Sequence, residues 1–135
     1  MRQMIGGCLC GQVRYQADVE PAFTSVCHCK NCQKQVGAAF SVLVAIPKSS
    51  LSVQGALKTF HGKGDSSQAV DRHFCPDCGS PIAMHVAVLS ELTFVNAGTL
   101  DDTSWISPTA EIFCDSAQPW VQLSGDMKRF SKMPF

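Results

Sequence analysis

Short apolar runs separated by turn-forming residues dominate the pattern along the chain. Residues 12–19 alternate loosely between polar and apolar side chains, and residues 40–46 (FSVLVAI) form a continuous apolar run. Further runs of strand length follow at 69–74, 81–88, 92–98, 111–114 and 120–123. Alternation with period two and short β-branched runs are typical of β-strands. The pattern therefore predicts a mainly β protein.

Two glycines mark further expected elements. Gly55 separates residues 51–54 from residues 57–62, which predicts a hairpin about that glycine. The one helix expected is short, around residues 29–37, and should end at Gly37 because glycine readily adopts the left-handed conformation past a helix C-terminus. Many short strands with frequent turns predict sandwich-like antiparallel sheets.

The length of 135 residues fits one domain with a self-sufficient core. No repeat, low-complexity stretch or linker interrupts the chain, so residues 1–135 are expected to form a single domain. The last part, about 125–135, is expected to be a C-terminal tail, with its basic stretch 127–132 solvated.

The charge balance limits the choice of partner. Eleven Lys and Arg residues match eleven Asp and Glu residues, whereas nucleic acids and anionic membranes favour proteins with surplus positive charge. Neither is expected as a partner. Residues 1–15 lack the apolar segment of a signal peptide, and no apolar run reaches membrane-spanning length. We therefore expect a cytoplasmic protein with reduced thiols.

Eight cysteines in a reducing compartment indicate metal binding more than disulfides. Cys75 and Cys78 form a Cys-x-x-Cys turn followed by glycine, a turn that usually supplies half of a tetrahedral zinc site. Cys8 and Cys10 lie two apart, so in extended chain both face the same side and can supply the other half. Four thiolates predict a closed, structural zinc site.

Cys27, Cys29 and Cys32 are spaced so that three thiolates can converge on a second ion. Three protein ligands with an exchangeable fourth position are the arrangement of catalytic zinc. Three thiolates leave a charge of about −1 on zinc, against about −2 for four. The second ion is therefore expected to be the better Lewis acid, able to hold a thiolate, water or carbonyl oxygen. Two zinc ions per chain are expected.

Other interpretations of the cysteines stay open. The second ion is structural if His28 or Cys114 supplies a fourth ligand. Iron suits the same thiolates. Disulfides and a thioredoxin-like redox role for Cys75 and Cys78 are less favoured, because no signal peptide is visible and the flanking residues predict strands.

The cysteine segments occur in a recognisable order over nearly the whole chain. GGCLCGQVRY is followed by CHCKNCQKQVGAAF, FCPDCGSPI, NAGTLDD, PTAEIF and QPW. The chain closely resembles the family of glutathione-dependent formaldehyde-activating enzymes and centromere protein V. The resemblance implies a mainly β, Mss4-like fold, similar to methionine sulfoxide reductase B and translationally controlled tumour protein. It also implies structural zinc at Cys8, Cys10, Cys75 and Cys78, and a second zinc at Cys27, Cys29 and Cys32.

The activity implied by the resemblance is that of a carbon–sulfur lyase, which interconverts glutathione plus formaldehyde and S-(hydroxymethyl)glutathione. Many relatives carry Arg where this chain has Gln33. Lys30 and Lys34, four apart on the expected helix, are candidate contacts for the carboxylates of a small thiol such as glutathione. His28 is expected to be a surface histidine, because in extended chain it points away from Cys27 and Cys29.

Two alternative functions accompany this hypothesis. One is a non-catalytic zinc module that binds a protein partner. The other, less favoured, is a redox enzyme like methionine sulfoxide reductase B, with Cys114 on a late strand as its nucleophile. A three-ligand zinc site favours the enzyme, because zinc deprotonates a thiol that binds to it.

Overall fold

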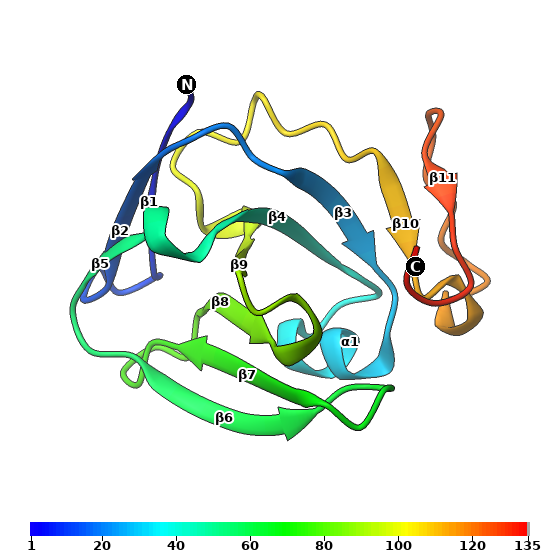
Figure 1. Ribbon diagram of the computed structural model, residues 1–135, viewed down its shortest axis with the longest axis horizontal. Coiled ribbons are helices and arrows are strands. Elements are labelled where there is room, and N and C mark those ends of the chain that lie inside the picture. The colour runs from blue at the N-terminus through cyan, green and yellow to red at the C-terminus, as the bar shows by residue number, and fades with distance from the viewer. Residues whose placement is uncertain (135) are drawn as a thin grey trace.

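Eleven strands in two sheets form the framework of the computed structural model, which describes residues 1–134. The small sheet has the order β1–β2–β5, with bounds Gln3–Gly7, Arg14–Asp18 and Ser52–Gln54. The large sheet has the order β11–β10–β3–β4–β9–β8–β7–β6. In that order its strands are Lys128–Arg129, Ala110–Ile112, Phe23–Cys27, Ser41–Pro47, Leu92–Asn96, Pro81–Val86, Ala69–Phe74 and Lys58–Lys63 (Figure 1).

The predicted mainly β fold is confirmed, with one difference in strand direction. Most neighbouring strands pair antiparallel, as expected, but β10 runs parallel to both β3 and β11. Parallel neighbours need a long connection, and the chain between β3 and β10 supplies it by forming most of the large sheet first.

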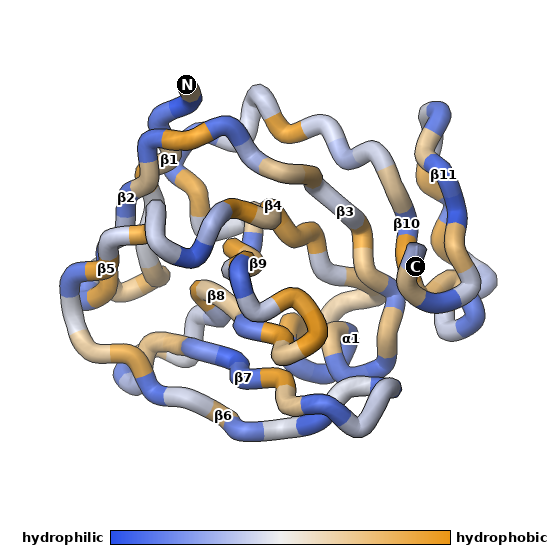
Figure 2. The backbone as a smooth tube through the Cα atoms, viewed as in Figure 1, coloured by the Kyte–Doolittle hydropathy of each residue, from blue (hydrophilic) through white to orange (hydrophobic). Residues whose placement is uncertain are grey.

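The central strand β4 explains the continuous apolar run at 40–46. Val44 and Ile46 pack into a core cluster shared with the small sheet, whereas Leu43 and Ala45 pack into a second cluster on the other face. A strand buried on both faces has no solvent side and needs no polar alternation. Figure 2 shows the hydrophobic stretches of β4 and β9 in the middle of the molecule and hydrophilic stretches on β7.

The predicted helix is α1, Lys30–Val36, and its ends follow the sequence. The Cys29 side chain accepts a hydrogen bond from the backbone N–H of Cys32 and so caps the N-terminus. Gly37 ends the helix with φ 68°, the left-handed conformation that glycine adopts at low cost. Within residues 1–134, no helix is long and apolar enough to cross a membrane.

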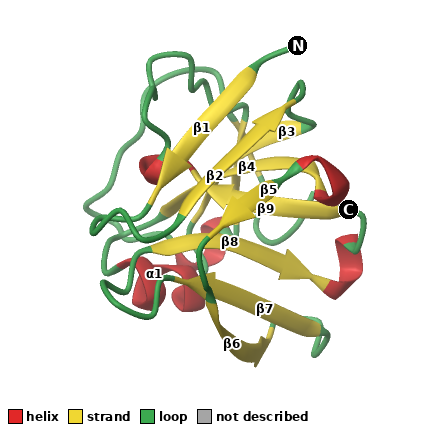
Figure 3. Cartoon of the chain, turned by 90° about the vertical axis from the view of Figure 1, so that its left-hand side faces the viewer, coloured by secondary structure: helices red, strands yellow, loops and turns green. Residues whose placement is uncertain are grey.

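The expected hairpin about Gly55 is wrong. Residues 52–54 pair with β2 in the small sheet, whereas residues 58–63 pair with β7 in the large sheet. Gly55 is therefore the point where the chain leaves one sheet for the other (Figure 3). Its φ of 98° suits glycine, and a Cβ there would lie 2.3 Å from the carbonyl oxygen of Gln12.

The C-terminal region also differs from expectation. Residues 120–123 lie outside the strands, because Trp120 is 73% exposed and provides no buried face. The basic stretch 127–132 is less detached than expected, since β11 pairs with β10 and Phe130 packs against the second core cluster. Position 135 of the expected tail lies outside the described residues.

Candidate functional site

The first group of thiols comes from two distant segments. Cys8 and Cys10 follow β1, and Cys75 and Cys78 lie in the turn between β7 and β8. Their four sulfur atoms lie within 4.8 Å of one another, with Cys10 Sγ 3.6 Å from Cys8 Sγ and 3.7 Å from Cys75 Sγ. Because β1 belongs to the small sheet and β7 to the large sheet, this four-thiol cluster joins the two sheets.

Backbone and hydroxyl groups orient these sulfurs. The backbone N–H of Val13 donates to Cys8 Sγ over 3.2 Å, and the Ser80 hydroxyl lies 3.3 Å from Cys78 Sγ. Hydrogen bonds from the Ser80 hydroxyl and backbone N–H lower the pKa of Cys78 to about 5. A thiolate is the form that binds metal, so the lowered pKa of Cys78 favours metal binding at this residue.

The geometry of the four-thiol cluster suits zinc. Thiolates about 2.3 Å from a tetrahedral zinc lie roughly 3.8 Å from one another, close to the 3.6 and 3.7 Å found between neighbouring sulfurs. All four cysteines are free thiols. The donor set therefore fits a closed zinc site.

The second group, the three-thiol cluster, lies where β3 meets α1. Cys27 ends β3, Cys29 caps the helix and Cys32 lies in its first turn, with the three sulfurs within 4.8 Å of one another. Hydrogen bonds from the Cys27 and Cys29 thiols lower the pKa of Cys32, and the positive charge of Arg72 adds to the effect. The same contacts with Cys29 and Cys32 raise the pKa of Cys27. Three such donors fit zinc with one further ligand.

His28 and Cys114 are not placed as a fourth ligand of the three-thiol cluster. In the described part of the chain, the ligand atoms that converge there belong to cysteines 27, 29 and 32 alone. His28 and Cys114 gather instead around Glu111, and Cys114 lies in the short 3₁₀ helix Cys114–Ser116 rather than on the expected strand.

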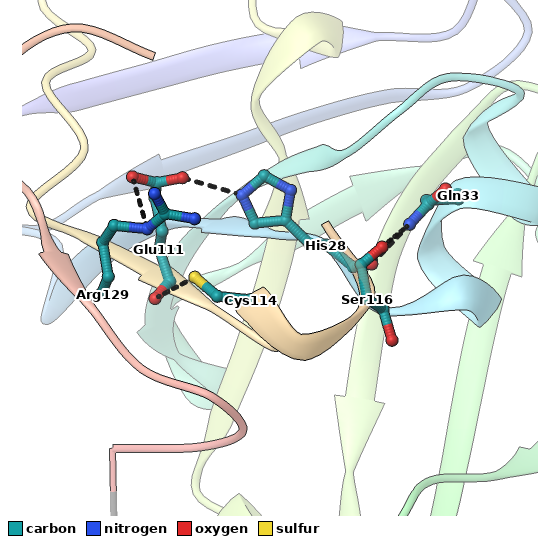
Figure 4. A network of polar contacts seen from close by, with 6 residues as sticks. All are labelled: His28, Gln33, Glu111, Cys114, Ser116 and Arg129. Carbon is teal, nitrogen blue, oxygen red and sulfur yellow. Dashed lines mark hydrogen bonds and ion pairs between the residues drawn. The ribbon is translucent and has the colours of Figure 1, made fainter. Parts of the chain in front are cut away.

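The expectation of a surface histidine at position 28 is wrong. His28 is 1% exposed, and its Nε2 lies 2.9 Å from Glu111 Oε1 (Figure 4). The side chain does avoid the three-thiol cluster, but β10 covers the side toward which it points, and Glu111 lies on that strand. Glu111 also lies 3.7 Å from Arg129 Nε, so the buried carboxylate has two cationic or proton-donating neighbours.

Gln33 holds the helix against the chain that follows β10. Its amide Nε2 donates to the carbonyl oxygens of His28 and Ser116, over 2.6 and 3.0 Å (Figure 4). Its Oε1 accepts a hydrogen bond from Gln118. The side chain is buried. Gln33 is thus a structural amide in this chain.

The three-thiol cluster opens into a cavity of about 620 Å³. Apolar side chains from several strands form much of its wall, among them Val70, Met84, Phe94 and Ile112. Charged side chains also line it: Lys30, Asp65, Arg72, Asp115 and Lys132. A small organic molecule can therefore reach the thiols in partly apolar surroundings.

Arg72 is the site residue that sequence reasoning missed. It is 9% exposed on β7, with Nη1 2.6 Å from Gln35 Oε1 and 3.7 Å from Cys32 Sγ. Its positive charge offsets part of the negative charge of the thiolates. The sequence could have indicated it, because Val70, Arg72 and Phe74 are alternate residues of one strand and face the same side of the sheet. A charged side chain among apolar neighbours is stable when buried only if a polar or charged group pairs with it.

Lys30 and Lys34 do not share one site. Lys30 lines the cavity of the three-thiol cluster. Lys34 lines a second pocket between α1 and strands β6 and β7. Although the two lysines are four residues apart on the helix surface, they line different pockets.

Fold and site together define a mainly β protein with a four-thiol cluster joining two sheets and a three-thiol cluster open to a cavity. The family model described as glutathione-dependent formaldehyde-activating enzyme matches residues 3–116. The chain therefore belongs to this family, and the resemblance seen in the sequence is confirmed.

Similar proteins agree with this assignment. A protein of Aspergillus flavus, named for the same glutathione-dependent formaldehyde activation, is 30% identical over 114 residues, covering 81% of this chain and 59% of that protein. The chain thus spans about three fifths of that relative. A Schizosaccharomyces pombe protein named as a lyase is 27% identical, covering 85% of this chain and 81% of its own. A Rhodobacter sphaeroides crystal structure shares the fold, with a TM-score of 0.60, 23% identity, and coverage of 78% and 92%.

Proposed function

We propose that the chain is a zinc-dependent enzyme of the carbon–sulfur lyase type that acts on adducts of thiols and aldehydes. The formation of S-(hydroxymethyl)glutathione from glutathione and formaldehyde is the reaction that the family name favours. The observation that carries the proposal is the convergence of Cys27, Cys29 and Cys32 at the wall of a cavity large enough for a small thiol.

The two clusters have different proposed roles. Cys8, Cys10, Cys75 and Cys78 would hold a structural zinc, and Cys27, Cys29 and Cys32 would hold a second zinc. When bound at the three-thiol cluster, zinc supplies positive charge that lowers the pKa of a nearby thiol or polarises a carbonyl oxygen. Both clusters require reduced cysteines, which supports a reducing compartment such as the cytoplasm.

The reaction transfers a proton and forms one bond. The substrate sulfur attacks the carbonyl carbon, the carbon–sulfur bond forms, and the carbonyl oxygen takes the proton that the thiol gives up. No electron is gained or lost overall. The chain's part is to favour the thiolate, orient it and limit access of water.

Side chains around the three-thiol cluster support the first and the last of these tasks. Arg72 provides a fixed positive charge beside Cys32, and Lys30 lines the same cavity without an ion pair within residues 1–134. Met84, Phe94 and Ile112 give the wall an apolar surface. Electrostatic interactions are stronger where water is excluded, so this wall strengthens the effect of both cations on a bound thiolate.

Exchange spectroscopy by NMR tests the proposal with glutathione and formaldehyde, measuring interconversion of free thiol and adduct. We expect the protein to accelerate exchange, and Cys29→Ser to reduce the acceleration by at least about 100-fold while leaving the fold intact. Cys75→Ser should instead unfold the domain, because metal binding at a structural site contributes folding free energy.

No acceleration with any of several thiols would overturn the enzymatic proposal and favour a non-catalytic zinc module. Circular dichroism measures whether each variant is folded. If Cys29→Ser and Cys75→Ser unfold the domain equally, the three-thiol cluster is structural as well.

A further inference from the structure

The second pocket, of about 550 Å³, adjoins the cavity of the three-thiol cluster. Asn31 and Arg72 line both spaces, so a ligand that extends from one into the other must pass these two side chains. The remaining lining residues of the second pocket are Lys34, Gln35, Phe60, Gly62, Lys63, Phe74 and Gly79.

The charge of this second pocket has one sign. Lys34, Lys63 and Arg72 line it, and no acidic residue does. None of the three is in an ion pair within residues 1–134. In the neighbouring cavity, by contrast, Lys132 lies 3.6 Å from Asp65 and 3.9 Å from Asp115. Two lysines without a charged partner in the described residues, together with Arg72, whose charge also acts on Cys32, attract an anion to this concave surface.

The second pocket is built from elements that are tied together. Asn31 on α1 donates through Nδ2 to the carbonyl oxygen of Lys63 at the end of β6, over 3.4 Å. Arg72 is buried and fixed by its hydrogen bond to Gln35. A guanidinium whose position is set before binding matches the planar fork of a carboxylate. Phe60, 62% exposed, adds an apolar surface beside the cations.

We propose that the second pocket is a carboxylate-binding subsite, which holds the acid group of the thiol whose sulfur lies at the three-thiol cluster. This rests on the proposed function and narrows its substrate to a peptide-like thiol with a carboxylate several bonds from the sulfur. Arg72, shared by both spaces, lies between the two ends of such a ligand. The aldehyde, small and uncharged, needs no anchor of this kind.

Binding of an inert analogue tests the subsite without any turnover. S-Methylglutathione, which has two carboxylates and no free thiol, is titrated into the zinc-loaded full chain and followed by amide chemical shifts. We expect it to bind about fivefold to tenfold more tightly than its dimethyl ester. The double variant Lys34→Gln/Lys63→Gln should lose most of this preference for the acid, because Arg72 is then the one cation left in the pocket lining. Shifts should centre on residues 34, 63 and 72.

Lys58→Gln is the matched control. Lys58 is an exposed lysine on the same strand as Lys63 and lines neither pocket, and its substitution removes one positive charge, as each of the two substitutions in the double variant does. We expect this variant to keep the preference for the acid over the ester. Equal affinity for acid and ester in the unmodified chain, or full acid affinity in the double variant, would overturn the subsite. An equal loss in Lys58→Gln would do the same, since it would show only an effect of net charge.

Rates of thiol exchange distinguish a failure of the carboxylate subsite from a failure of the proposed function. Acceleration that is equal for glutathione and its dimethyl ester keeps the lyase-type function and overturns the carboxylate subsite. Selective binding of the acid with no acceleration for any thiol keeps the subsite as an anion site and overturns the reaction.

Discussion

The buried side chain of Arg72 most clearly distinguishes the three-thiol cluster from the four-thiol cluster. Arg72 lies 3.7 Å from Cys32 Sγ, whereas the four-thiol cluster has no Arg or Lys among the hydrogen-bond partners of its sulfurs in the described residues. A site that only holds metal gains little from such a costly buried charge. A site that must stabilise an additional thiolate gains more.

Cys114 gives a prediction at the same scale. Its sulfur lies 3.5 Å from the carbonyl oxygen of Glu111, and the residue lines neither pocket. We expect Cys114→Ser to keep thiol exchange within about twofold and to remain folded. NMR exchange measures the first and thermal unfolding the second. Loss of activity equal to that of Cys29→Ser would restore the hypothesis that Cys114 is a nucleophile.

Single residues were predictable where their partners are near in sequence. The spacing of cysteines 27, 29 and 32 was enough to indicate a cluster, because one turn of helix brings the sulfurs together. His28 and Arg72 were not predictable in this way. Their partners, Glu111 and Cys32, lie 83 and 40 residues away, so their burial depends on how strands are ordered in the sheet.

Among the elements, α1 and the inner strands follow from local sequence. Residues 69–74 form β7 as predicted, and the run at 40–46 forms β4 with its start and end each shifted by one residue. The strands β1 and β3 were not predicted, since Gln3–Gly7 and Phe23–Cys27 mix small, polar and apolar residues. Their pairing partners, rather than their own pattern, define them as strands.

Gly55 provides a test at the scale of elements. Gly55→Ala should lower the free energy of unfolding by about 2 kcal/mol or more, since it adds left-handed strain and a Cβ 2.3 Å from the Gln12 carbonyl oxygen. Urea unfolding measures the change. Gly98→Ala is the control, because a Cβ there meets nothing within 4 Å and its φ is not left-handed. A change of similar size in both variants would contradict this account of the sheet-to-sheet connection.

For the whole molecule, the four-thiol cluster connects sheets that share few backbone hydrogen bonds. An isolated bridge joins Gly6 of the small sheet to Leu100, which follows β9, and the core cluster between the sheets includes Met4, Val44 and Ile46. A metal at this junction would act on the relative placement of both sheets. Its removal is therefore expected to affect the entire fold rather than one loop.

Metal removal tests this expectation. The purified chain should contain about two zinc ions, and Cys29→Ser about one. A strong chelator should lower the urea midpoint of both proteins by a similar amount, because the structural ion is common to both. Elemental analysis and circular dichroism give the two readouts. An unchanged midpoint after complete removal of zinc would show that the core alone holds the sheets together.

The parallel pairing of β3 with β10 has a consequence for how the chain is made. The backbone N–H of His28 donates to the carbonyl oxygen of Ile112, so the support behind Cys27 and Cys29 is complete only when that late segment has left the ribosome. At about 5–20 residues per second, the nascent thiols wait for several seconds without it. During this interval the thiols are less enclosed than in the folded chain, so we expect them to be oxidised more readily then than after folding.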